Sequence, residues 1–550
     1  MKKFLTFVLS ILLVLGFVAC EKTPAAEVTQ TQIQEGQLPG ASAEVSEIYL
    51  DSSYSTQERV ADLLSKMSLA DKAGQMVQGE QYPISEQDMA ELGLGSVLSG
   101  GGSVPDNINT VEHWNQEINA FQQAVLSRNL KIPFLYGADA VHGHNTVYGA
   151  VIFPHNIGIG AANDPELTQQ MGAYVAEEMK LTGILWNFAP CVAVVQDPRW
   201  GRTYESFSSD TDIVSELASA YAKGQMEGGV LPCAKHFVAD GGTTFGTGEG
   251  DYLIDRGDAQ ITAAINAGVD MLMEPYRYKE AVMAIVSGVE SGAIPQERVD
   301  DAVKRILTVK FDMGLFEDPY LDNASFGISE LGGQEGRALA KKLVEKSQVL
   351  LKNDNDILPF KRGQKIYIMG PAADNVGTQC GGWTMSWQGL MDTDLTPGTT
   401  ILQGMLDCAD EYGLTIITDE SKAAEADVVL MVLGEMPYAE YEGDTENLSI
   451  TGDHALGSNG KAMEKAKALG KPVVTLLVAG RNVLIDEYIG DWDAAVMSYL
   501  PGTEGDGVIS PLVGACEFTG KLPMPWYKAE TDIGKENPDL LFELGYGLTY

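Results

Sequence analysis

Residues 132–145 read IPFLYGADAVHGHN, an apolar run that reaches Gly137 and is followed at once by Asp139 in a polar loop. A strand, a polar loop and a helix, repeated along a chain, are typical of a parallel α/β barrel, whose chemistry lies on the loops after the strands. The same pattern recurs along the chain. Apolar runs lie at 96–99, 184–190, 232–238 and 269–273, and helical patterns lie at 165–181, 212–226 and 296–311. The sequence therefore predicts a barrel-like domain over 46–318.

A second α/β segment follows a connector at 319–335. Its buried-strand runs lie at 349–351, 365–369, 428–433, 473–478 and 494–499, with helical patterns at 337–347, 400–408 and 461–469. This alternation predicts a layered, mostly parallel sheet with helices on both faces, an α/β sandwich domain over 336–550.

The charge balance restricts the class of ligand. The 550 residues hold 77 Asp and Glu against 37 Lys and Arg, a formal net charge of −40. A surface this acidic repels phosphate backbones, which excludes nucleic acid as a partner and disfavours anionic substrates. A neutral ligand such as a sugar is unaffected by this field.

The N-terminus carries an export signal. Two lysines precede an apolar run from Phe4 to Val18, as in a signal peptide spanning 1–20, and the run is too short for a membrane span. The ending Phe-Val-Ala-Cys resembles a bacterial lipobox, which would make Cys20 the lipidated first residue; the alternative is an ordinary cleaved signal. Residues 21–45 form a low-complexity tether. We expect an exported bacterial protein, periplasmic or in the cell envelope and otherwise secreted, that touches a membrane only through this anchor.

Neither a disulfide framework nor a metal site is indicated. The remaining cysteines are widely spaced, odd in number and without a C-x-x-C pair, so we expect buried free thiols. His142 and His144 lack further ligands at recognisable spacing, and hydrogen-bonded loop histidines are the favoured interpretation. We expect no cofactor.

Polar side chains gather where the predicted barrel strands end. Asp139 follows one strand, Arg202 lies in the loop after another, and Lys235 and His236 end a third, shortly before Asp240. Carboxylate, guanidinium, ammonium and imidazole groups around one barrel mouth offer the donors and acceptors that a polyol ligand needs. The alternative for each residue alone is a structural ion pair.

The second segment adds aromatic rings and carboxylates. Trp383 and Trp387 lie four residues apart in a glycine-rich loop, and flat indoles suit the C–H faces of sugars, although a place in the core is the alternative. The strand at 428–433 runs into a carboxylate-rich loop with Glu435, Glu440 and Glu442, which could supply a general acid.

With these features in place, the chain resembles glycoside hydrolase family 3, the β-glucosidase and exo-β-glucan glucohydrolase type. The matching stretches occur in order through most of 50–550 and include GSVLSGGGSVP, IPFLYGADAVHGHN, FAPCVAVVQDPRWGRTYESF, AKHFVADGGTTFGTGEGDY, CGGWTMSWQG, LGEMPYAEYEGD and LPGTEGDG.

The resemblance implies a barrel domain, an α/β sandwich domain and an active site between them. It implies retaining cleavage of terminal non-reducing β-D-glucosyl residues from β-glucosides or β-glucan oligosaccharides. On matching positions, Asp139, Arg202, Lys235 and His236 resemble the ligands of the terminal glucose, which Glu249 supports. Trp383 and Trp387 resemble the clamp of the adjoining sugar. Glu440 is similar to the general acid/base, ahead of Glu435 and Glu442.

One part of the family pattern is missing. Asp258 runs directly into a helix that in the family follows the nucleophile, and the nucleophile's Ser-Asp-Trp occurs nowhere in the chain. Only ten residues separate Asp258 from Val269, so about two βα units of an eightfold barrel have no room. Such a barrel either stays open or closes with different shear.

The missing segment leaves the nucleophile unassigned. A retaining glycosidase needs two carboxyl groups ~5–5.5 Å apart, and only Glu440 can be named. Glu274, Asp240 and Asp251 are the candidate substitutes. The leading hypothesis is a glycosidase of β-glucosidase type. The alternatives are a catalytically impaired glucoside-binding lipoprotein and a phosphorylase, which the negative charge disfavours.

Overall fold

The computed structural model describes residues 47–237, 240–242, 257–321 and 330–550. In its first half, helices alternate with short strands from the beginning of the described chain to about residue 312. The helices are α1 (Thr56–Lys66), α2 (Leu69–Gln75), α3 (Glu86–Leu92), α4 (Val111–Leu126), α5 (Asn156–Ala162), α6 (Pro165–Leu181), α7 (Thr211–Glu227), α8 (Asp258–Asn266), α9 (Tyr278–Glu290) and α10 (Gln296–Asp312). The strands are β1 (Val77–Glu80), β2 (Ser96–Ser99), β3 (Leu135–Ala138), β4 (Trp186–Asn187) and β5 (Leu272–Met273).

These five strands form one parallel sheet in the order β4-β3-β2-β1-β5. Within the described residues, the run at 232–238, which the sequence predicts as a strand, makes only isolated bridges to its neighbour. Leu231, just before the run, and Lys235, within it, make isolated parallel bridges to Trp186 and Cys191, and the described part of the run forms no continuous strand. The N–H groups of Leu231, Cys233 and Lys235 still donate to backbone oxygens of residues 185–190.

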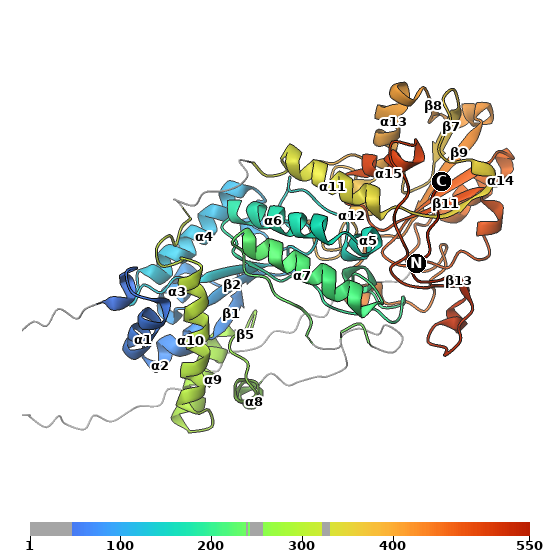
Figure 1. The fold of residues 1–550 in the computed structure, drawn as a ribbon. Helices are drawn as coiled ribbons and strands as arrows, with labels where there is room; N and C mark the ends of the chain where they lie inside the picture. Colours follow the sequence, from blue (N-terminus) through green and yellow to red (C-terminus); the bar gives the residue numbers. More distant parts are fainter. Residues whose placement is uncertain (1–46, 238–239, 243–256, 322–329) are drawn as a thin grey trace, which may run out of the picture. The chain divides into compact units, whose positions relative to one another are not determined.

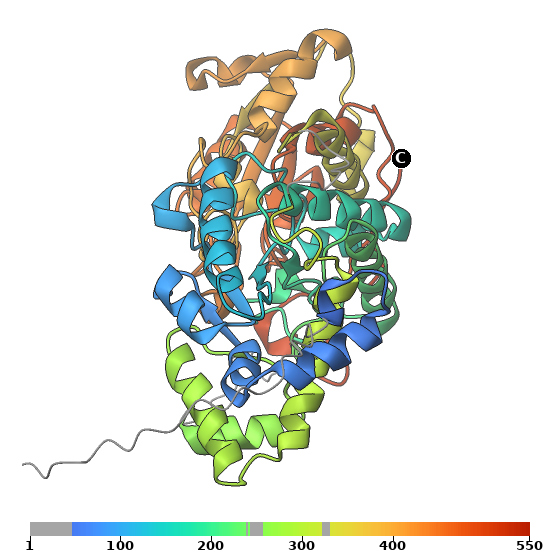
Figure 2. The same cartoon turned by 90° about the vertical axis from the view of Figure 1, so that its left-hand side faces the viewer.

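The last strand and helices of this half pack against its first strand and helices. Strand β5 pairs with β1, and α9 and α10 pack against α1 and α2 (Figures 1 and 2). A closed eightfold barrel also brings its last strand beside its first. The other edge of the sheet ends at residues 231–235, and no described residue joins that edge to β5. Over the described residues the sheet is therefore a half-barrel that stays open, one of the two outcomes expected for a barrel lacking about two units.

The second half is an α/β sandwich around a six-stranded sheet in the order β6-β11-β10-β9-β7-β8. Every pair is parallel except β6 with β11. The main strands are β6 (Val349–Asn353), β7 (Lys365–Met369), β8 (Thr415–Ile417), β9 (Val428–Gly434), β10 (Val473–Val478) and β11 (Ala494–Ser498), and β12 (Trp526–Tyr527) and β13 (Leu540–Phe542) form a separate ribbon. The helices are α11 (Gln334–Ser347), α12 (Val376–Cys380), α13 (Ile401–Tyr412), α14 (Asn459–Leu469) and α15 (Gly505–Leu512).

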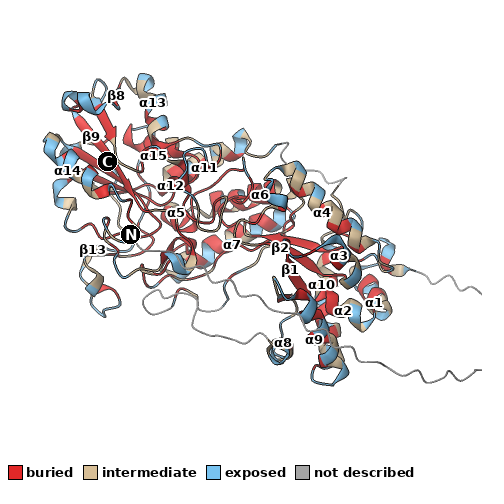
Figure 3. Ribbon diagram, turned by 180° about the vertical axis from the view of Figure 1, so that it is seen from behind, coloured by how far each residue is buried: buried red, intermediate tan, exposed pale blue. Residues whose placement is uncertain are grey.

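The two halves share a continuous core. Helix α11 packs against α5 and α6 of the first half and against α15 of the second (Figure 1). One cluster of buried apolar side chains includes Val77 and Trp200 as well as Val432 and Trp526. Figure 3 shows the strands of both sheets as buried, whereas α8 is largely exposed. The central strands of the second sheet, β9 and β10, are buried on both faces and are apolar runs.

Each helix within the described residues is too short or too polar to cross a bilayer.

Candidate active site

A cavity of about 540 Å³ lies where the carboxyl ends of β1, β2 and β3 meet loops of the second half. Its wall includes every described residue that the resemblance assigns to the sugar site: Asp139, Arg202, Lys235, His236, Trp383, Trp387 and Glu440. Its volume falls within the range of roughly 300–1,000 Å³ typical of small-molecule sites. The fold thus brings together side chains that are up to about 300 positions apart in the chain. Glu249 lies outside the described residues.

Arg202 lines the cavity and is held there by Glu205, a buried carboxylate that also accepts a hydrogen bond from Trp383. Its Nε and Nη2 donate to the two carboxylate oxygens of Glu205, at 2.8 and 2.9 Å. The indole N–H of Trp383 donates to the same carboxylate at 3.1 Å. Burial alone would raise the pKa of Glu205, but the adjacent guanidinium lowers it below its usual value. Glu205 is therefore an ionised, buried anchor for both side chains.

Glu440 faces the cavity from the loop after β9. It begins a 3₁₀ turn (Glu440–Gly443), and Arg202 Nη1 lies 3.3 Å from its Oε1. Gly201 makes this approach feasible, since a Cβ at that position would lie 1.9 Å from the backbone oxygen of Glu440. The contact with Arg202 is longer than those that Glu205 makes, so the guanidinium charge is balanced mainly by Glu205.

The other two glutamates of this loop lie elsewhere. Glu435 is buried, where Arg481 Nε donates to it at 3.0 Å and the Tyr438 hydroxyl donates at 3.0 Å. Glu442 is exposed and does not line the cavity. Of the three carboxylates considered for proton transfer, only Glu440 is in the cavity wall.

Asp139 and Lys235 form an ion pair in the cavity, with Lys235 Nζ 2.6 Å from Asp139 Oδ1. Burial disfavours the ammonium, but the carboxylates of Asp139 and Glu205 together outweigh burial and raise the pKa of Lys235. The same Nζ lies 5.5 Å from the centre of the Trp383 ring, within cation–π range. A charged acceptor and a charged donor therefore lie side by side, as bidentate recognition of neighbouring hydroxyls requires.

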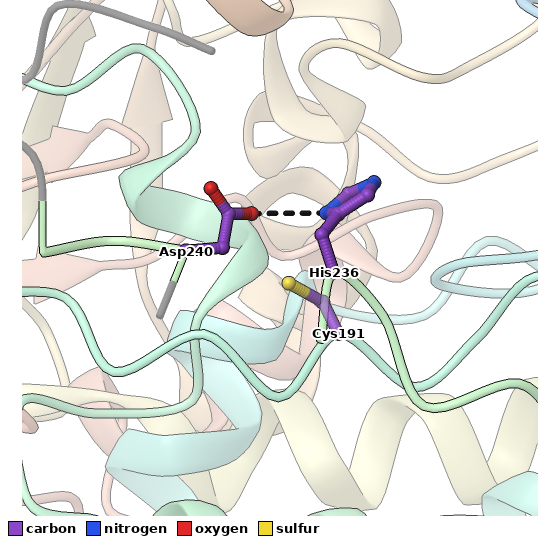
Figure 4. Close-up of side chains that lie close together, drawn as sticks. All are labelled: Cys191, His236 and Asp240. Carbon is purple, nitrogen blue, oxygen red and sulfur yellow. Dashed lines mark hydrogen bonds and ion pairs between the residues drawn. The ribbon is translucent and has the colours of Figure 1, made fainter. Parts of the chain in front are cut away.

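His236 and Asp240 form a hydrogen-bonded pair beside Cys191 (Figure 4). His236 Nδ1 lies 2.9 Å from Asp240 Oδ2, and its Nε2 lies 3.4 Å from Arg202 Nη2. Because guanidinium can only donate, Nε2 accepts and Nδ1 carries the proton. The ligand atoms of the three residues lie within 4.8 Å of one another, a spacing open to a metal ion. Burial raises the pKa of the Cys191 thiol to about 12.

His142 and His144 are buried histidines with separate hydrogen bonds. His142 Nδ1 lies 3.0 Å from the backbone oxygen of Phe153, and His144 Nε2 lies 2.8 Å from Thr182 Oγ1. Burial lowers the pKa of both imidazoles. They are the hydrogen-bonded loop histidines that the sequence favoured.

The two tryptophans of the glycine-rich loop differ in exposure. Trp383 is buried and held by Glu205, whereas Trp387 is half-buried, with its ring edge-on to Tyr441 at 5.6 Å. The backbone N–H of Trp383 donates to the oxygen of Trp387 at 2.9 Å, which fixes their relative position. Trp387 therefore presents the more accessible ring surface.

The candidate substitutes for the nucleophile do not converge on the cavity. Met273 and Pro275 line it, and Glu274 between them does not, as expected from the alternation of side chains along a strand. Asp240 is engaged by His236. Asp251 lies outside the described residues.

Sequence reasoning missed two carboxylates of the site. Glu80 ends β1, lines the cavity and is buried, and burial raises its pKa. Glu205 was missed although it follows Arg202 by three residues in Trp-Gly-Arg-Thr-Tyr-Glu, a spacing that allows an ion pair within one turn. For Glu80 the signal was weaker, because Val-Gln-Gly-Glu is not an apolar run.

The fold is that of an α/β protein whose cavity is lined by carboxylates, cations and indoles. Residues 68–263 match the Glycosyl hydrolase family 3 N terminal domain, and residues 348–550 match the Glycosyl hydrolase family 3 C-terminal domain. The exo-1,3/1,4-β-glucanase from a Pseudoalteromonas species is 33% identical, with a TM-score of 0.82 over 91% of this chain and 74% of that one. The chain belongs to glycosyl hydrolase family 3 and is of the β-glucosidase and exo-β-glucanase type.

Two curated relatives are more distant. The lysosomal β-glucosidase of Dictyostelium discoideum is 27% identical over 89% of this chain and 76% of its own length. The periplasmic β-glucosidase of Salmonella typhimurium is 26% identical over 89% and 80%. The first alignment spans 628 positions, more than the 550 residues of this chain, so the relative contains segments with no counterpart here. The N-terminal family match ends at residue 263, five residues beyond Asp258.

Proposed function

We propose that the chain binds the terminal non-reducing glucosyl unit of β-glucosides or β-glucan oligosaccharides in this cavity and hydrolyses its bond by a retaining mechanism, with Glu440 as acid/base. The observation that carries the proposal is the convergence of Asp139, Lys235 and Glu440 on one wall. The name of the Pseudoalteromonas relative, an exo-1,3/1,4-β-glucanase, supports β-glucans as the substrate class.

The proposed roles follow from the charges. Asp139 accepts from sugar hydroxyls while Lys235 and Arg202 donate to them, and charge-assisted hydrogen bonds of this kind are short and strong. Glu440, which lines the cavity, donates a proton to the glycosidic oxygen and later takes one from water. Trp387 stacks on the adjoining sugar. The nucleophile stays unassigned.

The test compares p-nitrophenyl β-glucoside hydrolysis by the wild type, Glu440→Gln and Glu442→Gln. Glu442 is a matched control because it lies two residues away and is exposed. We expect Glu440→Gln to lose at least about 100-fold in kcat/KM, the usual contribution of general acid–base catalysis, and Glu442→Gln to match the wild type. Equal activity of Glu440→Gln and the wild type rejects the role of Glu440.

A second candidate is a glucoside-binding lipoprotein without turnover. It is favoured by the absence of Ser-Asp-Trp from the 550 residues and by the partners of the remaining cavity carboxylates, since Asp139 is paired with Lys235 and Glu80 with Ser103. This function predicts thermal stabilisation by glucose without hydrolysis. A covalent 2-fluoroglucosyl adduct, located by peptide mass spectrometry, rejects it and identifies the nucleophile.

We also propose that the protein is exported and anchored through Cys20. The support is the sequence of residues 1–20 alone. Mass spectrometry of the mature N-terminus should detect a diacylglyceryl group on Cys20, and a mature chain starting at another residue contradicts the anchor.

A further inference from the structure

Glu80 holds the loop that follows the neighbouring strand. It ends β1, and its register partner in the parallel sheet is Leu98 of β2. The backbone N–H of Gly100 donates to its Oε2 at 3.0 Å, and the Ser103 hydroxyl donates to its Oε1 at 2.7 Å. Both carboxylate oxygens are therefore committed to the 100–103 loop.

The same loop lies directly against the tryptophan loop of the second half. A Cβ on Gly102 would be 2.7 Å from Ser386 Cα, and one on Gly101 would be 3.3 Å from Trp387 Cβ. Both glycines have positive φ, +54° at Gly101 and +82° at Gly102, so the loop depends on glycine for its conformation as well as for this close approach. Glu80 is therefore hydrogen-bonded to a loop that lies close to Ser386 and Trp387.

Glu80, Gly101 and Trp387 also line one cavity. A displacement of the 100–103 loop therefore removes the support of the Trp387 ring on the cavity side. The ion pair of Asp139 with Lys235 and that of Arg202 with Glu205 do not pass through this loop. The loop therefore lies next to Trp387 but takes no part in the two ion pairs proposed to surround the terminal sugar.

We propose that Glu80 is a positioning residue that holds the 100–103 loop against Ser386 and Trp387 and so sets the affinity of the cavity for the second sugar of a β-linked oligosaccharide. The proposal rests on the proposed function, because it takes the ligand to be a β-glucoside. It adds a residue outside the predicted sugar ligands and assigns it to selectivity for chain length.

Three substitutions test the proposal, and they remove the hydrogen bonds between Glu80 and the loop to different extents. Glu80→Met keeps the length of the side chain and removes both acceptors. Glu80→Gln can still accept from Gly100 and donate to Ser103 Oγ, and Ser103→Ala removes one of the two bonds. The exposed Glu86, changed to Met, is the matched control.

The measurements are affinity for laminaribiose and for glucose by calorimetry, with each protein carrying Glu440→Gln so that laminaribiose is not hydrolysed, and hydrogen exchange of peptides covering 98–104 and 383–388. We expect Glu80→Met to weaken laminaribiose binding about tenfold, with glucose changed less than about twofold, and Glu80→Gln and Ser103→Ala to fall between it and the wild type. Exchange should accelerate in both peptides of Glu80→Met and in neither peptide of Glu86→Met.

Two outcomes overturn the proposal: faster exchange at 98–104 with no change at 383–388, or an equal loss of affinity for both sugars. If Glu80→Met does not fold, Glu80→Gln and Ser103→Ala decide the same comparison. A wild type that binds neither sugar rejects the proposed function and with it the role in selectivity, whereas hydrogen exchange still decides whether Glu80 holds Trp387 in place.

Discussion

Glu205 and Trp383 are joined by a hydrogen bond of 3.1 Å that crosses from the half-barrel to the sandwich. The carboxylate that accepts it also holds Arg202 in a two-pronged ion pair. The position of the indole and the position of the guanidinium are therefore not independent. The site is built on this buried carboxylate, which has little contact with solvent.

Replacing Glu205 should destabilise the whole chain. Glu205→Gln leaves the buried Arg202 without its main counter-charge, and removing one partner of a buried pair costs about 3–5 kcal/mol. Trp383→Phe keeps that pair and should cost about 1 kcal/mol. Urea unfolding measures both, with the exposed Glu216→Gln as control. A Glu205→Gln variant as stable as the control contradicts the anchoring role.

Asp139→Asn should weaken glucose binding by about 10- to 100-fold, because a hydrogen bond to a charged acceptor contributes about 1.5–3 kcal/mol. Lys235 would also lose its counter-charge at 2.6 Å. Calorimetric titration with glucose measures the loss, and Asp486→Asn, an exposed aspartate outside the cavity, is the control. Unchanged affinity in Asp139→Asn shows that the sugar binds elsewhere.

Lys310 should make stability depend on pH. Its Nζ is buried and donates to Gln75 and to the backbone oxygen of Pro133, and burial lowers its pKa to about 7. The unfolded chain, with a lysine pKa of about 10.4, binds more protons between these values. The free energy of unfolding therefore rises with pH from about 7 to 10, by at most about 1.4 kcal/mol per pH unit for this group.

Lys310→Met should remove that rise, and Lys304→Met, exposed on the same helix, should retain it. Urea unfolding at several pH values gives the slope for each variant. Identical slopes in the two variants show that Lys310 is charged in the folded chain throughout this range.

Gly201→Ala should displace the Glu440 loop. A Cβ would lie 1.9 Å from the Glu440 oxygen and 2.8 Å from Gly443 C, both backbone atoms that cannot rotate away. We expect a loss of about 1–3 kcal/mol of stability, as for other overpacked positions, together with reduced glucoside turnover or binding. Gly457→Ala, whose Cβ would meet nothing within 4 Å, is the control. A fully active Gly201→Ala disproves the close fit between these loops.

The sequence predicted the second sheet closely because its strands are buried on both faces. The run at 428–433 is continuous and apolar, and every residue of β9 is buried. The run at 473–478 coincides with β10. In these two strands complete burial coincides with an apolar composition, which marks them in the sequence.

The first sheet was harder to predict because several of its strands carry polar side chains inward. In β1, Gln78 donates to Ser96 Oγ and Glu80 binds the 100–103 loop, so polar residues are buried there without an apolar run. The partners of such residues are far away in sequence and become visible only in the fold. The loop residues that line the cavity were predictable from the resemblance, whereas Glu80 and Glu205 hold other parts of the chain and leave no comparable pattern.

The open edge of the half-barrel is consistent with the sequence from which about two βα units are missing. Strand β5 still pairs with β1, so the chain keeps the pairing between the last and the first strand that is typical of a barrel. Whether the remaining carboxylates support turnover depends on the nucleophile, which the trapping experiment identifies.

A crystal structure with bound glucose tests the central claim most directly. We predict one glucose in the cavity, with its hydroxyls within hydrogen-bond distance of Asp139, Lys235 and His236, and with Glu440 and Trp387 on the side of its anomeric carbon. Glucose bound away from Asp139 and Lys235, or an empty cavity at saturating glucose, contradicts the account.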